Sequence, residues 1–437
     1  MRKYFGSETE KAIQNFPFDY RQFHKEFIHA IATIKKAAAA ANVEAKNLDH
    51  ARGSAIQKAA EEVMKGSWDD QFSLPALMGA AGTSIHMNVN EVIANRATEI
   101  LKKKRSKLTV HPNDHVNRSQ STNDVNPSAI KIAAAPLVKN LDKTLSDLAR
   151  AFKKKGREFR NISKLGRTHL MDAVPITLGE EFLAYASLIE GHRKEIPRLF
   201  NILTTLSLGG SAAGNSVNAS PAYRRSIYKN LKKITGLPVK PAVNLMARAG
   251  SQTDVLSVSQ ALVALTLDCS KIATDLRLMA SGPYGGFGEI NLKELQRGSS
   301  IMPGKVNPVL PETVNVLHYV VSGNNLTIEK AAEGANFELA VMIPPVADRL
   351  LENLKAVNDV LGAFTKRCVH SITANKARAE ELLESSTAYA TALTPILGYE
   401  TMSAIVKESV KSGKTIRELV ITKKLLTDKE FDKAVRR

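Results

Sequence analysis

Cysteine, aromatic residues and long apolar runs are scarce in this chain, and each scarcity argues against a class of protein. Only two cysteines, Cys269 and Cys368, occur in 437 residues, and neither has metal-ligand spacing, so we expect no disulfide scaffold, no metal site and a reducing cytoplasm. Aromatic residues make up 5% of the chain, which suits aliphatic packing between helices better than a β-sandwich. No apolar run of bilayer length and no apolar signal core near Met1 is found, so no membrane is expected as a partner.

Acidic residues are outnumbered by basic ones, and the formal net charge is +18. Such a charge suits nucleic acid, an anionic surface or anionic substrates. The two densest basic runs, 102–105 and 153–155, fall where helices are expected to end, and cations there complement the helix dipole. No aromatic residues interleave with these runs and no nucleic-acid motif is present. We therefore expect a solvated basic surface and no nucleic-acid partner, and a basic nucleic-acid binder remains the last alternative.

Long helical patterns dominate the sequence. The segment 251–281 has neither Gly nor Pro, and its apolar residues from Val255 to Met279 recur in steps of three and four. Similar seams run along 137–152, 178–199 and 346–368. A helix over 251–281 would be about 45 Å long, which predicts packing in a bundle and pairing with other subunits.

Sustained strand alternation is scarce, so the predicted fold class is all-α, with three parts. We expect an N-terminal mixed helical domain over 1–126, a central bundle of long helices over 127–358 and a small helical C-terminal domain over 359–437. These boundaries are soft by several residues.

One loop, residues 298–308 with the sequence GSSIMPGKVNP, concentrates polar chemistry. Its glycines and prolines keep it out of helix and strand, and loops commonly carry function. Lys305 offers a point charge for an anion, Asn307 can hydrogen-bond a carboxylate, and either Ser299 or Ser300 can act on a proton if its oxyanion is stabilised. The alternative is a plain solvated turn.

Three further polar segments interrupt the helical patterns, at 82–91, 111–124 and 166–175, and Glu312 follows the loop. Hydroxyls, amides and imidazoles of this kind can grip a small dianion, whereas the chain has no nucleotide-binding fingerprint and no His-Glu-x-x-His metal motif. Each segment alone has a plainer interpretation. Residues 121–124 resemble a helix N-cap, His169 a histidine at a helix end, and Glu312 a helix cap.

All four segments, in order, resemble the fumarase/aspartase superfamily from Tyr4 to Ala434. The resemblance implies a helical-bundle homotetramer that eliminates a group beside a carboxylate to give fumarate or a relative, without any cofactor. It also implies active sites shared between subunits, with a small dicarboxylate such as L-aspartate or fumarate as the bound partner.

Within the superfamily, residues 82–85, 119–124, 275–283 and 308–312 look most like aspartate ammonia-lyases. Class II fumarase, with water in place of ammonia, is the first alternative, and a catalytically silent scaffold is the second. The chain departs from the usual family residues at several positions, among them His86, Asn215, Tyr284 and Ile343.

The resemblance also implies roles for individual residues. Ser299 would be the general base that removes a Cβ proton, and a serine needs a stabilised oxyanion for that task. The donors to the β-carboxylate would be Thr83, Ser121, Thr122 and Ser300. The residues that hold the α-carboxylate would be Lys305, Asn307, Thr168 and His169. Asn123 would contact the amino group, and Glu312 would orient His169.

Overall fold

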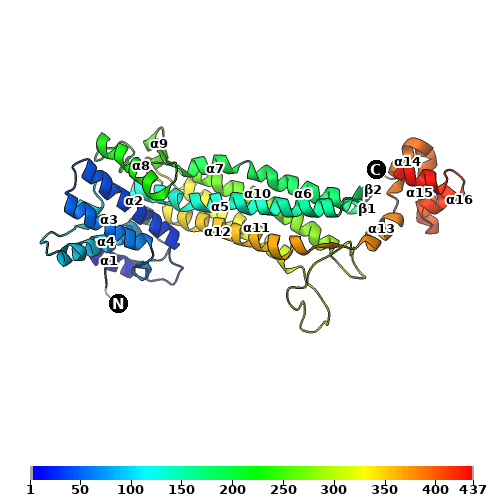
Figure 1. Ribbon diagram of the computed structural model, residues 1–437, viewed down its shortest axis with the longest axis horizontal. Helices are drawn as coiled ribbons and strands as arrows, with labels where there is room; N and C mark the ends of the chain where they lie inside the picture. The colour runs from blue at the N-terminus through cyan, green and yellow to red at the C-terminus, as the bar shows by residue number, and fades with distance from the viewer. Residues whose placement is uncertain (1–2, 436–437) are drawn as a thin grey trace. The chain divides into compact units, whose positions relative to one another are not determined.

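The computed structural model describes residues 3–435, and these fold into two compact units (Figure 1). Unit 1 comprises Met1–Asp142, Lys194–Ala264 and Tyr319–Asn358. Unit 2 comprises Lys143–Arg193, Leu265–His318 and Asp359–Arg437. The division into three domains made from the sequence stays a prediction, since each unit is assembled from three separate stretches of chain.

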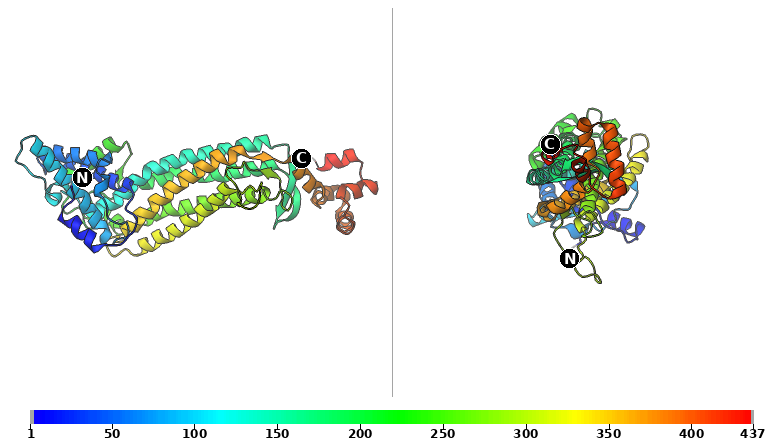
Figure 2. Two further views of the ribbon diagram at one scale, coloured as in Figure 1. Left: turned by 90° about the horizontal axis from the view of Figure 1, so that it is seen from below. Right: turned by 90° about the vertical axis from the view of Figure 1, so that its right-hand side faces the viewer.

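Four long helices contribute residues to both units. They are α5 (Thr122–Glu158), α10 (Thr253–Met279), α11 (Val309–Glu333) and α12 (Ile343–Arg367). Side-chain hydrogen bonds join neighbouring helices, such as Asn140 to Asn358 at 2.9 Å and Asn315 to Ser270 at 2.8 Å. Figure 2 shows these helices running alongside one another. The seams predicted at 137–152, 251–281 and 346–368 are therefore confirmed as helices.

The fourth predicted seam, 178–199, is not a continuous helix. It is divided between α6 (Leu178–Arg193) and α7 (Ile196–Leu203). Pro197 lies in the first turn of α7, where its missing N–H costs nothing, whereas inside a continuous helix its ring would clash with the carbonyl of Arg193. The apolar residues do lie in helices on both sides of the break, but Pro197 prevents α6 from continuing into α7.

The other elements of unit 1 are helices and two very short strands. They are α1 (Ser7–Asn15), α2 (Lys25–Glu44), α3 (His50–Met64), η1 (Asp69–Gln71), η2 (Ala80–Gly82), α4 (Thr83–Lys103), η3 (Pro112–Val116), β3 (Thr205–Leu206), α8 (Pro221–Thr235), β4 (Lys240–Pro241) and α9 (Leu245–Ala249). Helix α2 packs against both α3 and α8. Its alanines 37–39 and 41 are buried, and a Cβ at Gly53 of α3 would lie 2.2 Å from Val43 Cγ2, so small residues permit this close approach.

The other elements of unit 2 include its one longer hairpin and a set of short C-terminal helices. They are β1 (Ser163–Thr168), β2 (Met171–Thr177), β5 (Ile290–Asn291), η4 (Val369–Ser371), β6 (Thr373–Ala374), α13 (Lys376–Glu384), α14 (Tyr389–Leu397), α15 (Tyr399–Ser412), α16 (Ile416–Thr422) and α17 (Asp428–Val435). Strands β1 and β2 are antiparallel, with Ser163 opposite Thr177. Helices α14–α17 share a small core around Phe431.

By length and composition alone helix α10 could cross a membrane, since an 18-residue window in it has a mean hydropathy of 1.4. Charged residues such as Asp268 and Lys271 interrupt the helix, so it is not an uninterrupted apolar run. Within the fold this helix has protein partners. Asp275 accepts a hydrogen bond from Tyr185 of α6 at 3.0 Å, and Arg277 donates to Asn315 of α11 at 2.9 Å. Helix α10 is therefore a core helix of this fold.

An aromatic cluster fills the core of unit 2. The ring of Phe152 on α5 lies 6.1 Å from Phe182, 5.7 Å from Tyr185 and 6.4 Å from Phe364, centroid to centroid. Phe152 is fully buried, so Phe152→Ala leaves a cavity between three helices. We expect it to lower the free energy of unfolding by about 3–5 kcal/mol in denaturant titrations. The matched control is Tyr399→Ala, an aromatic residue that is 77% exposed; an equal loss in both variants would contradict this account.

Candidate active site

Unit 1 brings the start of α4 beside the start of α5. The amide nitrogen of Asn126 on α5 donates to the carbonyls of Ala81 and Gly82, at 3.0 and 3.1 Å. The chain just before Thr83 is left-handed at three successive residues, since φ is 56° at Ala80, 53° at Ala81 and 74° at Gly82. Left-handed alanines are strained, and such strain is maintained only where the surroundings fix it. Asn126 supplies that fixation and holds Thr83 at the helix start.

The predicted site residues of unit 1 are Thr83 and the run Ser121–Asn123, and all of them are at least partly accessible. Thr83 Oγ1 donates to the carbonyl of Ala80 at 2.8 Å. Ser121 Oγ accepts the N–H of Asn123 at 3.3 Å, so the N-cap interpretation of this run is correct. Capping uses only the hydroxyl oxygen as an acceptor, and the Ser121 O–H can still donate to a ligand.

Asp124 lies behind these residues and is buried. Its carboxylate accepts three backbone N–H groups, from Ser121, Gly209 and Ser211, each at 3.0 Å. Burial raises the pKa of Asp124 to about 6, against the lowering effect of these backbone donors. The carboxylate thereby attaches the segment 209–211 to the start of α5, and Asn123 Nδ2 adds a hydrogen bond to the carbonyl of Ala212 at 2.7 Å.

Unit 2 carries the loop 298–308, which is closed at its base. The N–H of Gly298 donates to the carbonyl of Lys305 at 3.1 Å, and Asn307 Nδ2 donates to the carbonyl of Gly298 at 2.6 Å. A Cβ at Gly298 would lie 2.1 Å from the Lys305 carbonyl oxygen, so only glycine fits there. Gly304 has a φ of +78°, which also favours glycine.

Ser299 receives two backbone hydrogen bonds within this loop. Its Oγ accepts the N–H of Ile301 at 3.2 Å and the N–H of Met302 at 3.1 Å. Two N–H dipoles aimed at one hydroxyl oxygen stabilise negative charge on that oxygen. Ser300 and Lys305 are exposed on the same loop, and Lys305 has no ion-pair partner among residues 3–435. The loop thus presents a hydroxyl oxygen that two N–H dipoles stabilise, and it carries an exposed cation.

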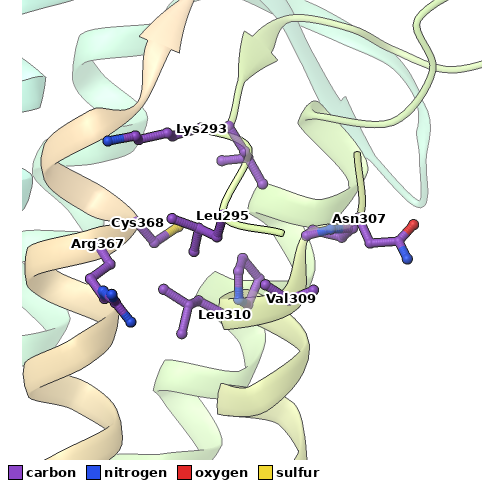
Figure 3. A pocket seen from close by; sticks show the side chains of 10 residues that line it. Lys293, Leu295, Asn307, Val309, Leu310, Arg367 and Cys368 are labelled. Atoms are coloured by element: carbon purple, nitrogen blue, oxygen red, sulfur yellow. The ribbon is translucent and has the colours of Figure 1, made fainter. Parts of the chain in front are cut away.

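A small pocket at the base of the loop is not the substrate site. It has a volume of about 10 Å³ and lies among 292–295, 307–311 and the end of α12 at Arg367 and Cys368. Figure 3 shows the Asn307 amide pointing away from it. Burial raises the pKa of the Cys368 thiol to about 12, so this group stays protonated.

A larger open hollow of about 680 Å³ lies in unit 1, lined by 215–221 together with Arg118 and Arg224. None of the predicted site residues lines it.

Thr168 ends strand β1, and His169 is the first residue of the turn of the β1–β2 hairpin. Thr168 pairs with Met171, and the two residues of the turn, His169 and Leu170, have φ values of 55° and 63°. The alternative interpretation of His169 as a histidine at a helix end is therefore wrong. Two-residue turns that match strand twist require left-handed residues, and neither position here is glycine. The His169 side chain is exposed and available to a ligand.

Glu312 lies in the first turn of α11, and its N–H donates to the carbonyl of Pro308 at 3.0 Å. Across residues 3–435 of a single chain, no side-chain hydrogen bond or ion pair joins Glu312 or Ser299 to His169. Unit 2 therefore presents its predicted site residues as two separate groups, one on the loop and one on the hairpin.

Several residues that hold the site were not among the sequence predictions. They are Lys35, Asp124, Asn126 and Glu289. Lys35 left a usable signal, because Ile28, Ile31 and Ala38 share its face of α2 in steps of three and four, which predicts burial of the lysine. No comparable signal identified Glu289.

Known proteins similar to this chain cover nearly its whole length. The family model described as lyase matches residues 1–323, and one described as fumarase C C-terminus matches 390–437. Aspartate ammonia-lyase of Bacillus subtilis is 44% identical over 430 residues, 98% of this chain and 90% of that protein. Class II fumarate hydratase of Brucella suis is 39% identical over 436 residues, 99% of this chain and 94% of that protein. The crystal structure of class II fumarase from Schistosoma mansoni, 32% identical, superposes with a TM-score of 0.95 over 100% of this chain and 95% of that one.

Proposed function

The chain belongs to the fumarase/aspartase superfamily of lyases and has its all-α fold, and we propose that it is an aspartate ammonia-lyase. It would convert L-aspartate to fumarate and ammonia, in the cytoplasm. The observation that carries the proposal is the Ser299 hydroxyl with its two backbone N–H donors on a loop that Gly298 and Gly304 shape. The higher identity to the Bacillus subtilis aspartate ammonia-lyase than to the fumarate hydratase supports ammonia as the leaving group.

In the proposed reaction the Ser299 alkoxide removes a proton from Cβ of L-aspartate. The electron pair of that C–H bond moves onto the β-carboxylate, which becomes an aci-carboxylate with two negative oxygens. The pair then returns to form the Cα=Cβ double bond as the C–N bond breaks and ammonia leaves. A free serine is not ionised at neutral pH. The N–H groups of Ile301 and Met302 would stabilise the alkoxide form of Ser299.

The remaining residues would hold the two carboxylates. Hydroxyls of Thr83, Ser121, Thr122 and Ser300 would donate to the β-carboxylate, and these bonds strengthen as negative charge develops there. The α-carboxylate would be held by Lys305, Asn307, Thr168 and His169. Asn123 would contact the amino group.

We also propose a homotetramer whose sites combine residues of different subunits. The observation that favours it is that, among residues 3–435 of one chain, no side-chain hydrogen bond or ion pair joins Ser299 or Glu312 to His169. Glu312 of one chain would then orient His169 of another chain. The proposed reaction would need neither a metal nor a cofactor.

Class II fumarase is the second candidate, because the residues proposed to bind the two carboxylates of aspartate could also bind those of malate. The Brucella suis relative is a fumarate hydratase. A silent scaffold is disfavoured by the oxyanion-stabilising arrangement at Ser299.

The test is the ultraviolet absorbance of fumarate, recorded with purified protein and either L-aspartate or L-malate. We expect fumarate from L-aspartate and none from L-malate, with D-aspartate as the stereochemical control. Fumarate from malate alone would establish the fumarase instead. Silence with both substrates would overturn both enzymatic assignments.

A further inference from the structure

A buried chain of polar side chains leads from α2 to the start of α5. Lys35 Nζ lies 2.6 Å from Nε2 of His86 on α4, and Nδ1 of His86 lies 2.8 Å from Oγ1 of Thr122. The exposed fractions of Lys35 and His86 are 0% and 2%, whereas Thr122 is partly accessible. This series of hydrogen bonds therefore ends at the Thr122 hydroxyl, which a ligand can reach.

The hydrogen bonds around Lys35 define which atoms donate. Its Nζ donates to Asn117 Oδ1 at 2.9 Å and to Gln120 Oε1 at 3.1 Å. The orientation of the Gln120 amide is fixed because its nitrogen donates to the Arg118 carbonyl at 3.0 Å. When Lys35 is charged, its ammonium has three donors and no acceptor, so its third hydrogen goes to Nε2 of His86.

The histidine then has one tautomer available. Burial, and secondarily the charge of Lys35, lowers the pKa of His86 well below its usual range, so the imidazole is neutral. Burial also lowers the pKa of Lys35 to about 7, and the Asp124 carboxylate opposes that shift. Below a pH of about 7, where Lys35 is charged and Nε2 accepts from it, the imidazole proton resides on Nδ1 and is donated to Thr122 Oγ1.

We propose that Lys35 and His86 are positioning residues that direct the Thr122 hydroxyl proton toward the substrate carboxylate. The proposal rests on the assignment of Thr122 as a carboxylate donor in the proposed function. Because the Thr122 oxygen already receives a hydrogen bond from Nδ1, its own proton is left for an anionic oxygen. A donor oriented before substrate arrives needs no reorganisation as charge develops, and this is the effect that accelerates the reaction.

A double-mutant cycle between His86 and Thr122 tests this coupling. Thr122→Val should lower kcat/KM for L-aspartate roughly 10²-fold, the usual effect of removing one such donor. His86→Leu should lower it about tenfold or more, chiefly through kcat, and should have no further effect in the Thr122→Val background. His86→Asn should restore most of the activity, because its amide nitrogen can replace Nδ1 as the donor. Additive effects of the two changes would overturn the proposal.

A matched control separates this coupling from general damage to the fold. His318→Leu removes an imidazole 3.1 Å from the hydroxyl of Thr266, a similar pair in unit 2, and should leave kcat/KM unchanged. All variants are compared by circular dichroism and thermal unfolding. A fall in His318→Leu equal to that in His86→Leu would count against a specific role for His86.

The tautomer itself can be measured without any activity. In protein labelled with ¹⁵N in the histidine rings and studied below a pH of about 7, where Lys35 is charged, the His86 resonances, assigned by their loss in His86→Asn, should show Nδ1 protonated and Nε2 not. A proton on Nε2 would overturn the proposal even in an active enzyme. If the tautomer is as expected but neither substrate reacts, the proposed function fails and the role of Thr122 in this reaction fails with it.

Discussion

Ser299→Ala is expected to abolish turnover of L-aspartate while leaving the fold intact. Removing a general base typically lowers the rate by 10²- to 10⁴-fold, and no other side chain on the loop 298–308 has two backbone N–H groups aimed at its oxygen among residues 3–435. The loss should lie in kcat, because Ser299 acts on the Cβ proton and does not hold a carboxylate. Steady-state fumarate production measures it directly.

The control for Ser299→Ala must separate chemistry from loop structure, since the same oxygen also holds the turn at Ile301 and Met302. Losing two exposed turn hydrogen bonds should cost about 1 kcal/mol each or less, so the loop base at Gly298 and Asn307 should persist. Ser385→Ala, which removes an exposed hydroxyl bonded only to the carbonyls of its own helix, is the matched serine variant and should retain full activity. Near-normal activity of Ser299→Ala would require another base.

The long helices could be predicted because apolar residues that recur in steps of three and four fall on one side of a helix. That side can be buried as a whole. The seams along α5, α10 and α12 followed that rule. The break before Pro197 was also present in the sequence, but a period count over apolar residues does not include the proline. The hairpin 163–177 was not predicted, because its residues do not alternate and both residues of its turn, His169 and Leu170, are unusual in left-handed conformation.

The candidate site, too, could be predicted only where its residues are adjacent in sequence. Loop 298–308 could be located because glycine, proline and polar residues adjacent in sequence define a turn. The residues that hold the site act from far along the chain: Lys35 reaches His86 across 51 positions, and Arg167 reaches Glu289 across 122. Such pairs depend on helix packing, and a single sequence carries only the burial pattern of each partner. The N-cap at Ser121 shows a further limit, since one hydroxyl can cap a helix and still be proposed to bind substrate.

Glu289→Gln is expected to destabilise unit 2 more than any surface change. The carboxylate is fully buried, with Oε1 2.9 Å from Arg167 and Oε2 3.2 Å from Lys164. Lys164 is also buried and has Glu181 as a second partner at 2.8 Å, while the Arg167 guanidinium stacks on Phe287. Neutralising the carboxylate leaves Arg167 without this carboxylate partner and leaves the buried Lys164 with Glu181 as its remaining partner. We expect the free energy of unfolding to fall by about 3–5 kcal/mol in denaturant titrations.

The consequence of Glu289→Gln for function follows from its position, because Lys164 and Arg167 belong to β1, the strand that ends at Thr168 and leads directly into His169 of the turn. A loosened hairpin should weaken the grip on the α-carboxylate, and KM should rise more than kcat falls. Glu190→Gln is the matched control, since its ion pair with Lys153 is about 40% exposed and should contribute only about 0–1 kcal/mol. Adding Lys164→Met to Glu289→Gln should recover part of the lost stability by removing one of the buried charges. If Glu289→Gln costs no more than Glu190→Gln, then water or backbone groups already compensate the cations, and the buried carboxylate does not hold the hairpin.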